Sequence, residues 1–202
     1  MSDEALALIQ RRLVLSVSAK ENFVRESGPL LVRLADVMRR SLEAGGKILV
    51  FGNGGSAADA QHFAAEFVNR FLVNRRPLAA LALTTDTSAL TAIANDFAFE
   101  EIFAKQIEAL GRQEDVAIGI STSGNSKNVL RGLEAARAIG MTRVGLTGGI
   151  PQDGARPGGK MAPLCDVLLN VPCRDTPQIQ ECHLFIEHLL CELVERAMFP
   201  QN

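Results

Sequence analysis

Features that mark secreted, membrane-bound or nucleic-acid-binding proteins are missing from this 202-residue chain. Its longest apolar stretches are only as long as a strand, and Met1 to Glu4 carry no basic residue, so we expect neither a membrane span nor a signal peptide. The formal net charge is -2 and the pI is near 6.0. Without a basic face or a basic amphipathic helix, nucleic acids and membrane surfaces are unfavoured partners. We therefore expect a cytoplasmic protein whose ligands are small and neutral or anionic.

The cysteines are few and form no C-x-x-C pair. Cys165, Cys173, Cys182 and Cys191 are scattered, mostly among apolar residues. Because metal and redox motifs need closely spaced thiols, this spacing predicts four reduced, mostly structural cysteines.

Nucleotide-binding motifs are missing as well. The glycine-rich stretch 52–56 lacks the third glycine of G-x-G-x-x-G, and the basic stretch 74–76 stands about 20 residues later, where a ribose-binding acid is needed. No Gly-Lys-Ser/Thr is present, since the only Gly-Lys pair, Gly159-Lys160, is followed by Met161. A nucleotide is therefore not the expected ligand.

The chain does contain two short loops rich in glycine and hydroxyl groups, Gly52-Asn53-Gly54-Gly55-Ser56 and Ser121-Thr122-Ser123-Gly124-Asn125-Ser126. Each follows an apolar run and precedes a helix-like segment, so each is expected at a helix N-terminus. Unpaired backbone N–H groups and the helix dipole attract anions there, and glycine permits close approach. One such junction is usually only a tight turn with a serine N-cap. Two in one chain, with five hydroxyls and no lysine, favour a phosphorylated small molecule.

Apolar periodicity predicts one α/β domain over residues 1–202. Apolar residues make up 47% of the chain, enough to bury roughly 70% of its unfolded surface. Residues 3–44 predict two helices, ended by Gly45-Gly46. The rest predicts strands and helices in alternation: strands 47–51, 79–83, 115–120, 143–147 and 166–171, and helices 56–70, 86–94, 99–110, 125–138 and 177–198. This alternation is typical of a parallel sheet of about five strands with helices on both faces and ligands at the carboxyl ends of the strands. Residues 148–163, rich in glycine and proline, predict a mobile surface loop.

The N-terminal helices and helix 177–198 are more apolar than one sheet requires. Their apolar stripes could pack on the sheet or against another subunit, and periodicity does not separate these alternatives. Because contiguous exposed apolar area is rare on a soluble monomer, we expect segment 1–45 to contribute to oligomerisation, with Leu34 on its outer stripe.

All three histidines lie on two predicted helices. Helix 56–70 carries His62 and Glu66 four residues apart, one turn above each other on the face that begins at the first loop. The last helix supplies Gln180, His183 and His188. An i, i+4 His/Glu pair is most often only a hydrogen-bonded pair. Together with a distant histidine, however, it also suits a zinc ion or acid/base catalysis.

Together these motifs resemble the sedoheptulose 7-phosphate isomerases, also called phosphoheptose isomerases, of the sugar isomerase (SIS) domain superfamily. The similar segments are the two loops, His62-Phe63-Ala64-Ala65-Glu66, Asn95-Asp96, and Ile179-Gln180-Glu181-Cys182-His183 with His188, in order over nearly the whole chain. The resemblance implies a single SIS domain with a three-layer, flavodoxin-like α/β sandwich, and a homotetramer with active sites at subunit interfaces. It also implies conversion of sedoheptulose 7-phosphate to D-glycero-D-manno-heptose 7-phosphate. That reaction begins bacterial ADP- or GDP-heptose synthesis for lipopolysaccharide.

The same resemblance assigns roles to individual residues. It places one zinc ion per subunit on His62, Glu66, Gln180 and His188. It takes the substrate contacts from Asn53, Gly54, Gly55, Ser56, Glu66, Asn95, Asp96, Ser121, Thr122, Ser123, Ser126 and Gln180. Moving a proton between adjacent carbons through an enediolate needs a base near the carbons and an acid near the oxygens. We assign Glu66 as the base and His188 as the acid.

Spacing alone leaves the pairing of ligands on the last helix open. Gln180 and His188 are eight residues apart, a rise of about 12 Å on an ideal helix. Gln180 with His183 would converge more easily. The family pattern favours His188 and leaves His183 as a structural histidine.

Two noncatalytic classes share much of this pattern. One is a bacterial replication-initiation factor of the same superfamily that binds the initiator protein and closely resembles segment 90–96. In that group the positions of Glu66 and His188 are substituted, whereas both residues are present here. The other comprises sugar-phosphate-sensing regulators, which usually carry a DNA-binding domain for which we expect no room. The isomerase is therefore the favoured interpretation.

Overall fold

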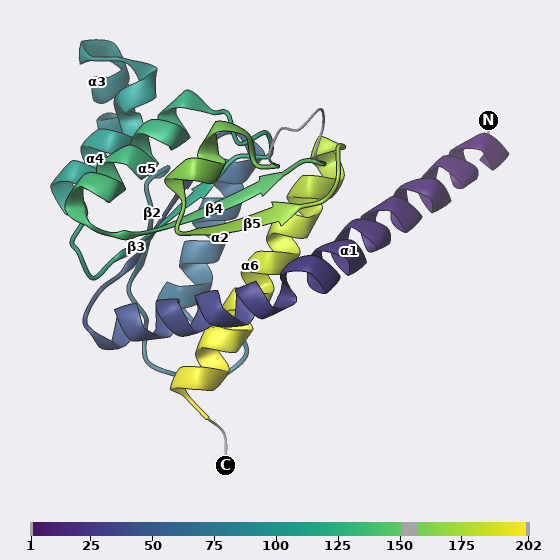
Figure 1. Cartoon of the computed structure of the whole chain (residues 1–202), viewed down its shortest axis with the longest axis horizontal. Helices are drawn as coiled ribbons and strands as arrows, with labels where there is room; N and C mark the ends of the chain where they lie inside the picture. Colours follow the sequence, from purple (N-terminus) through teal and green to yellow (C-terminus); the bar gives the residue numbers. More distant parts are fainter. Residues whose placement is uncertain (1, 151–156, 201–202) are drawn as a thin grey trace.

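The computed structural model describes residues 2–150 and 157–200, and helices and strands alternate along it as predicted (Figure 1). The elements in chain order are α1 (Ser2–Glu43), β1 (Ile48–Gly52), α2 (Gly55–Val68), β2 (Ala80–Ala82), α3 (Thr87–Asp96), η1 (Phe99–Glu101), α4 (Ile102–Leu110), β3 (Val116–Ile120), α5 (Lys127–Ile139), β4 (Thr142–Gly148), η2 (Gly159–Leu164), β5 (Val167–Val171) and α6 (Thr176–Met198). The elements η1 and η2 are short 3-10 helices.

All five strands are parallel, and their order in the sheet is β2-β1-β3-β4-β5. This order confirms the predicted flavodoxin-like sandwich. The chain reverses its direction of winding between β1 and β3, which pair directly with Gly52 opposite Ile120. The two glycine- and hydroxyl-rich loops therefore leave the sheet side by side at its carboxyl edge, where parallel sheets bind ligands.

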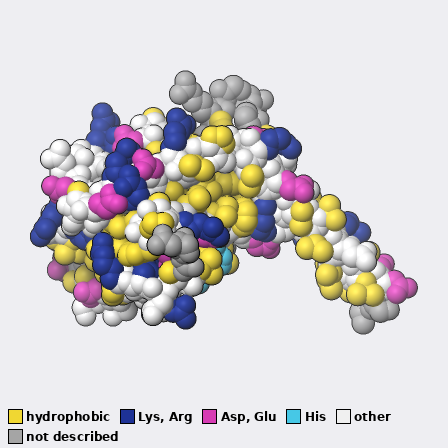
Figure 2. Space-filling model, turned by 90° about the horizontal axis from the view of Figure 1, so that it is seen from below, with side chains coloured by type: hydrophobic (Ala, Val, Ile, Leu, Met, Phe, Trp, Pro, Cys, Tyr) yellow, Lys and Arg dark blue, Asp and Glu magenta, His cyan; other side chains and the backbone are white. Residues whose placement is uncertain are grey.

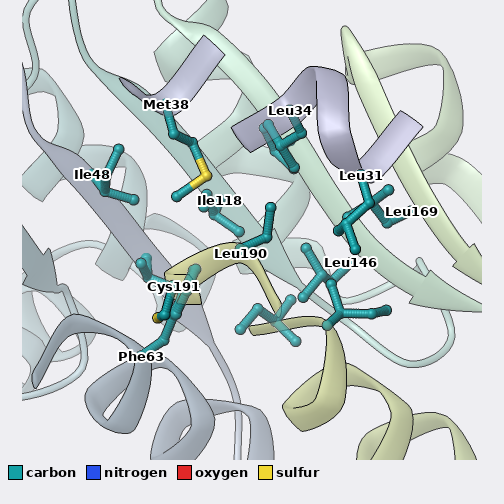
Figure 3. Packing of buried hydrophobic residues seen from close by; sticks show 14 of the residues in the cluster. Leu31, Leu34, Met38, Ile48, Phe63, Ile118, Leu146, Leu169, Leu190 and Cys191 are labelled. Carbon is teal, nitrogen blue, oxygen red and sulfur yellow. The ribbon is translucent and has the colours of Figure 1, made fainter. Parts of the chain in front are cut away.

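Successive residues of a strand face opposite sides of the sheet and build two separate cores. Ile48 and Val50 of β1 belong to a cluster with α1, α2 and α6, whereas Leu49 and Phe51 belong to a cluster with α4 and α5. Figure 3 shows the first core, where side chains of these three helices meet those of β1, β3, β4 and β5. As a result α2 and α6, which carry all three histidines, share one face of the sheet.

The N-terminal region forms one helix, so the prediction of two helices in residues 3–44 is wrong. Helix α1 spans 42 residues with Pro29 inside it. Proline removes one backbone donor and bends a helix, but the helix continues here because its next turns, with Leu34, are buried against the sheet. Figure 1 shows α1 bending midway, with its N-terminal half standing clear of the body. Leu34 itself is 0% exposed, which contradicts its predicted place on an outer stripe. Despite its length, neither α1 nor any other described helix is apolar enough to cross a membrane.

The predicted loop 148–163 is only partly irregular. Its residues 151–156 lie outside the described part of the chain. The end of the segment forms η2, which packs against α5 and β4.

Candidate active site

Two asparagines tie the first loop to the second. Asn53, just after β1, and Asn128, in the first turn of α5, exchange two hydrogen bonds in which each Nδ2 donates to the Oδ1 of the other at 2.8 Å. Asn128 is buried, and its Oδ1 also accepts from the N–H of Val129 at 2.9 Å. The side chain of Asn53, a predicted substrate contact, is thus engaged within the protein. Sequence reasoning missed Asn128, although its place in the first turn after the second loop could have indicated it.

The second loop presents hydroxyl groups at the start of α5. The Oγ atoms of Ser121 and Ser126 lie 3.0 Å apart, and Ser121 is buried. Ser126 is the N-cap of α5, and its side chain accepts no hydrogen bond from the helix. Its hydroxyl and the N–H groups of the first turn therefore face the position where an anion would bind. Element η2 stabilises the second loop through a hydrogen bond, in which the N–H of Met161 donates to the carbonyl of Gly124 at 2.9 Å.

A cavity of about 360 Å³ adjoins this loop. Thr122 and Ser123 line it from the loop, and Arg174 and Thr176 line it from the start of α6. Two of the predicted hydroxyl-bearing residues, Thr122 and Ser123, thus line a cavity together with Arg174 and Thr176.

Helices α2 and α6 bring together three predicted side chains. The Nε2 atoms of His62 and His188 lie 2.9 Å apart, although the two residues are 126 positions apart in the sequence. The Oε1 atom of Glu66 lies 3.6 Å from the same Nε2 of His62. The side chains of His62 and Glu66 are 41% and 24% exposed, so in a single chain this cluster is open to solvent.

These three side chains have the donor atoms that zinc prefers, but they do not form a closed metal site. Among the described residues, no group of three or more His, Cys, Asp or Glu side chains is placed to hold a metal. Two tetrahedral zinc ligands would stand roughly 3.3 Å apart, so the two imidazoles at 2.9 Å would have to separate slightly. A zinc ion on His62, Glu66 and His188 would therefore require these side chains to rearrange.

The fourth predicted ligand, Gln180, lies beside the start of α2. Its Nε2 donates to the Oδ2 of Asp59 at 3.2 Å, and a Cβ on Gly55 would overlap its amide. A Cβ at position 55 would therefore require the Gln180 amide to move. Burial raises the pKa of Asp59, against the opposing effect of the hydrogen bond from Gln180. Sequence reasoning missed Asp59, which the i, i+3 spacing to His62 places on the same face of α2.

The remaining polar residues of α6 lie in the core. His183 is 0% exposed, its Nε2 donates to the carbonyl of Thr147 at 3.1 Å, and burial lowers its pKa to about 4. Glu187 is fully buried as well, and neither of its carboxyl oxygens has a hydrogen-bond partner within the described residues. Burial, with the nearby charge of Asp59, raises the pKa of Glu187 to about 9. No signal in the sequence distinguished Glu187 from a surface acid.

Two predicted substrate contacts lie apart from this cluster. Asn95 and Asp96 end α3, where the Nδ2 of Asn95 donates to the Oδ1 of Asp96 at 2.8 Å. Helix α3 packs on α4 and η1, which belong to the side of the sheet opposite α2 and α6 (Figure 1). A single chain therefore does not bring Asn95 and Asp96 to His62, Glu66 and His188. Ser56, in the first turn of α2, is buried beside the first loop.

Comparison with known proteins agrees with this architecture. The SIS domain family model matches residues 16–148. A phosphoheptose isomerase of Desulfovibrio desulfuricans is 54% identical over 199 residues, which cover 98% of this chain and 91% of that protein. One from Paramagnetospirillum magneticum is 60% identical over 168 residues, covering 83% of this chain and 84% of its own. The solved structure of a phosphoheptose isomerase from Neisseria gonorrhoeae superposes with a TM-score of 0.86 at 45% identity, covering 96% of this chain and 99% of that one. The chain therefore belongs to the phosphoheptose isomerase family of SIS-domain proteins.

Proposed function

We propose that this isomerase converts sedoheptulose 7-phosphate to D-glycero-D-manno-heptose 7-phosphate, with Glu66 as general base and His188 as general acid. The observation that carries this proposal is the cluster of His62, Glu66 and His188 on two helices that begin at the carboxyl edge of the sheet. In this cluster the Nε2 of His62 lies 2.9 Å from the Nε2 of His188 and 3.6 Å from the Oε1 of Glu66. The product would enter bacterial ADP- or GDP-heptose synthesis and so lipopolysaccharide. The reaction would take place in the cytoplasm.

The chemistry divides between the two helices. The Glu66 carboxylate removes a proton from C1 of the ketose and returns it to C2, while His188 moves a proton between the oxygens on C2 and C1. The phosphate binds Ser121, Thr122, Ser123 and Ser126 with the N–H groups of α5, which fixes the carbon chain relative to the base. A bound zinc ion, held by His62, Glu66 and His188 with Gln180 turned toward it, would supply Lewis-acid stabilisation of the negative charge on oxygen.

The other function considered, a noncatalytic factor that binds the replication initiator, lacks support here. Glu66 and His188 are both present, on adjoining helices, and both side chains lie close to His62. The curated relatives at about half identity over the full chain are named isomerases.

A homotetramer fits two features of the single chain. The N-terminal half of α1 stands clear of the body and exposes large apolar side chains: Leu6, Leu8, Ile9, Leu13, Val14, Leu15 and Val17. Asn95 and Asp96 lie on the far side of the sheet from the catalytic cluster of their own chain. Assembly through α1 would cover the apolar arm, and α3 of one subunit could then complete the site of another.

The direct test of the proposed reaction is incubation of the purified protein with sedoheptulose 7-phosphate. The appearance of aldose phosphate in the NMR spectrum is the expected result. If only the ketose remains, with or without added zinc, the proposed substrate is wrong.

Removing the hydroxyl of Ser126 should weaken substrate binding more than turnover. Ser126→Ala should raise KM, with a smaller change in kcat, because a phosphate remote from the reacting carbons is held equally in the ground and transition states. Steady-state kinetics of Ser126→Ala, Ser121→Ala and the double variant measure this effect. An unchanged KM in all three variants would show that the phosphate does not bind to this loop.

The two histidines of α6 should respond differently to replacement. His188→Asn should lower kcat by at least ~100-fold, the scale of lost acid/base catalysis. His183→Asn should instead lower thermal stability by about 1–3 kcal/mol, because the buried bond to Thr147 is disturbed, with little change in kcat of the folded protein. Calorimetry and kinetics on both variants test the contrast. The reverse order would make His183 the catalytic residue.

A further inference from the structure

A buried ion pair fixes the segment between α2 and β2. The side chains of Arg75 and Glu195 are each 2% exposed, and Nε of Arg75 lies 2.9 Å from Oε1 of Glu195. The carboxylate also accepts from the backbone N–H groups of Phe71, Leu72 and Val73 at 3.2, 2.8 and 2.8 Å. Burying charge is costly unless its hydrogen bonds are all made, and this carboxylate has four partners. Glu195, near the end of α6, therefore determines the path of residues 71–73.

The other partner of the pair closes the end of α2. Nη2 of Arg75 donates to the carbonyl of Glu66 at 2.8 Å, and its Nη1 donates to the carbonyl of Phe67 at 2.9 Å. These carbonyls belong to the last turn of α2 and have no partner within the helix. A cation there also interacts favourably with the helix dipole. The backbone of Glu66 is thus bonded directly to a guanidinium group that α6 holds in place.

The segment that Glu195 determines carries an aromatic ring to the catalytic histidine. The ring of Phe71 stacks on the imidazole of His188, with centroids 5.5 Å apart and an angle of 29° between the planes. The Nε2 of the same imidazole lies 2.9 Å from Nε2 of His62. The imidazole of His188 is thus contacted by Phe71 from one segment and by His62 from α2.

We propose that Phe71, Arg75 and Glu195 are positioning residues of the isomerase. They fix the position of the Glu66 backbone on α2 relative to the His188 ring on α6. The inference rests on the roles proposed above for Glu66 and His188. Replacing a buried ion pair by apolar side chains of similar volume is often neutral or stabilising, so stability alone is a weak reason to keep one here. The hydrogen bonds of the Arg75–Glu195 pair instead connect α6 to the backbone of the base, Glu66, on α2. Through the N–H of Phe71 they also connect to the ring that stacks on the acid, His188.

The test replaces Phe71 while leaving the ion pair intact. Phe71→Leu should lower kcat by about 10- to 100-fold with KM within about 3-fold of wild type, because the phosphate loop is untouched while the acid is misplaced. Phe71→Tyr keeps the ring and should retain most of kcat. In NMR spectra of protein labelled at its three histidines, the signal of His188 should lose the ring-current shift in Phe71→Leu and keep it in Phe71→Tyr.

A matched core variant separates positioning from stability. Phe103 is buried in the core on the opposite face of the sheet, so Phe103→Leu should lower the melting temperature without lowering kcat of the folded protein. Glu195→Gln, which keeps shape but removes charge, should act on kcat in the same direction as Phe71→Leu. Wild-type kcat in Phe71→Leu, or equal losses of kcat in Phe71→Leu and Phe103→Leu, would overturn the inference. Either result, with wild-type protein active on sedoheptulose 7-phosphate, would leave the proposed function standing.

Discussion

Replacing Glu66 by glutamine should lower turnover by at least ~100-fold, while leaving the fold and sugar-phosphate binding nearly unchanged. Glutamine has almost the same shape as glutamate but cannot take up a proton, so only the base is removed. The Glu66 side chain is 24% exposed on α2, and its carboxylate lies 3.6 Å from the Nε2 of His62. Measurement of kcat with sedoheptulose 7-phosphate, and of ligand binding by calorimetry, would separate the two effects.

The matched control is Glu108→Gln on α4. Glu108 is 52% exposed and pairs with Lys105 on the far side of the sheet, so its replacement should change neither kcat nor binding. Activity of Glu66→Gln within a few-fold of wild type would remove Glu66 from the mechanism. Loss of binding as well as turnover would make Glu66 primarily a ligand of substrate or metal.

A charge on the exposed arm of α1 should dissociate the assembly and abolish activity together. Leu13 is 64% exposed, and Figure 2 shows apolar side chains spread along the arm where it leaves the body. Burying a glutamate in a subunit contact is strongly unfavourable, so Leu13→Glu should yield smaller species. If α3 of a neighbour supplies Asn95 and Asp96, these species should be inactive. Light scattering combined with an activity assay tests both parts.

The position of the charge matters for this experiment. Leu34 is fully buried against the sheet, so Leu34→Glu would unfold the protein rather than dissociate it. Leu13→Met, which keeps an apolar side chain of similar volume at the same position, is the control and should keep both size and activity. A Leu13→Glu variant with the size and activity of wild type would show that the arm does not assemble the active protein.

The sequence by itself determined the order of strands and helices after residue 45 and the place of the two loops. Apolar runs separated by helical periodicity require a parallel sheet, and connections between parallel strands place each loop at the carboxyl edge. That geometry follows from local patterns, so both loops could be placed at this edge without coordinates. The pairing of His62 with Glu66 is local too, because residues four apart on a helix share a face.

Only the tertiary structure decided which residues of different elements meet. A helix pattern shows on which face of the helix a side chain lies. Only the packing of α2 against α6 decides that His188 reaches His62 while His183 enters the core. The link between Asn53 and Asn128 likewise joins loops that are adjacent only because β1 pairs with β3. Helix α1 stayed continuous through Pro29 because burial of the following turns outweighs one lost backbone bond. Such contacts depend on distances between elements far apart in the chain, and no local periodicity encodes them.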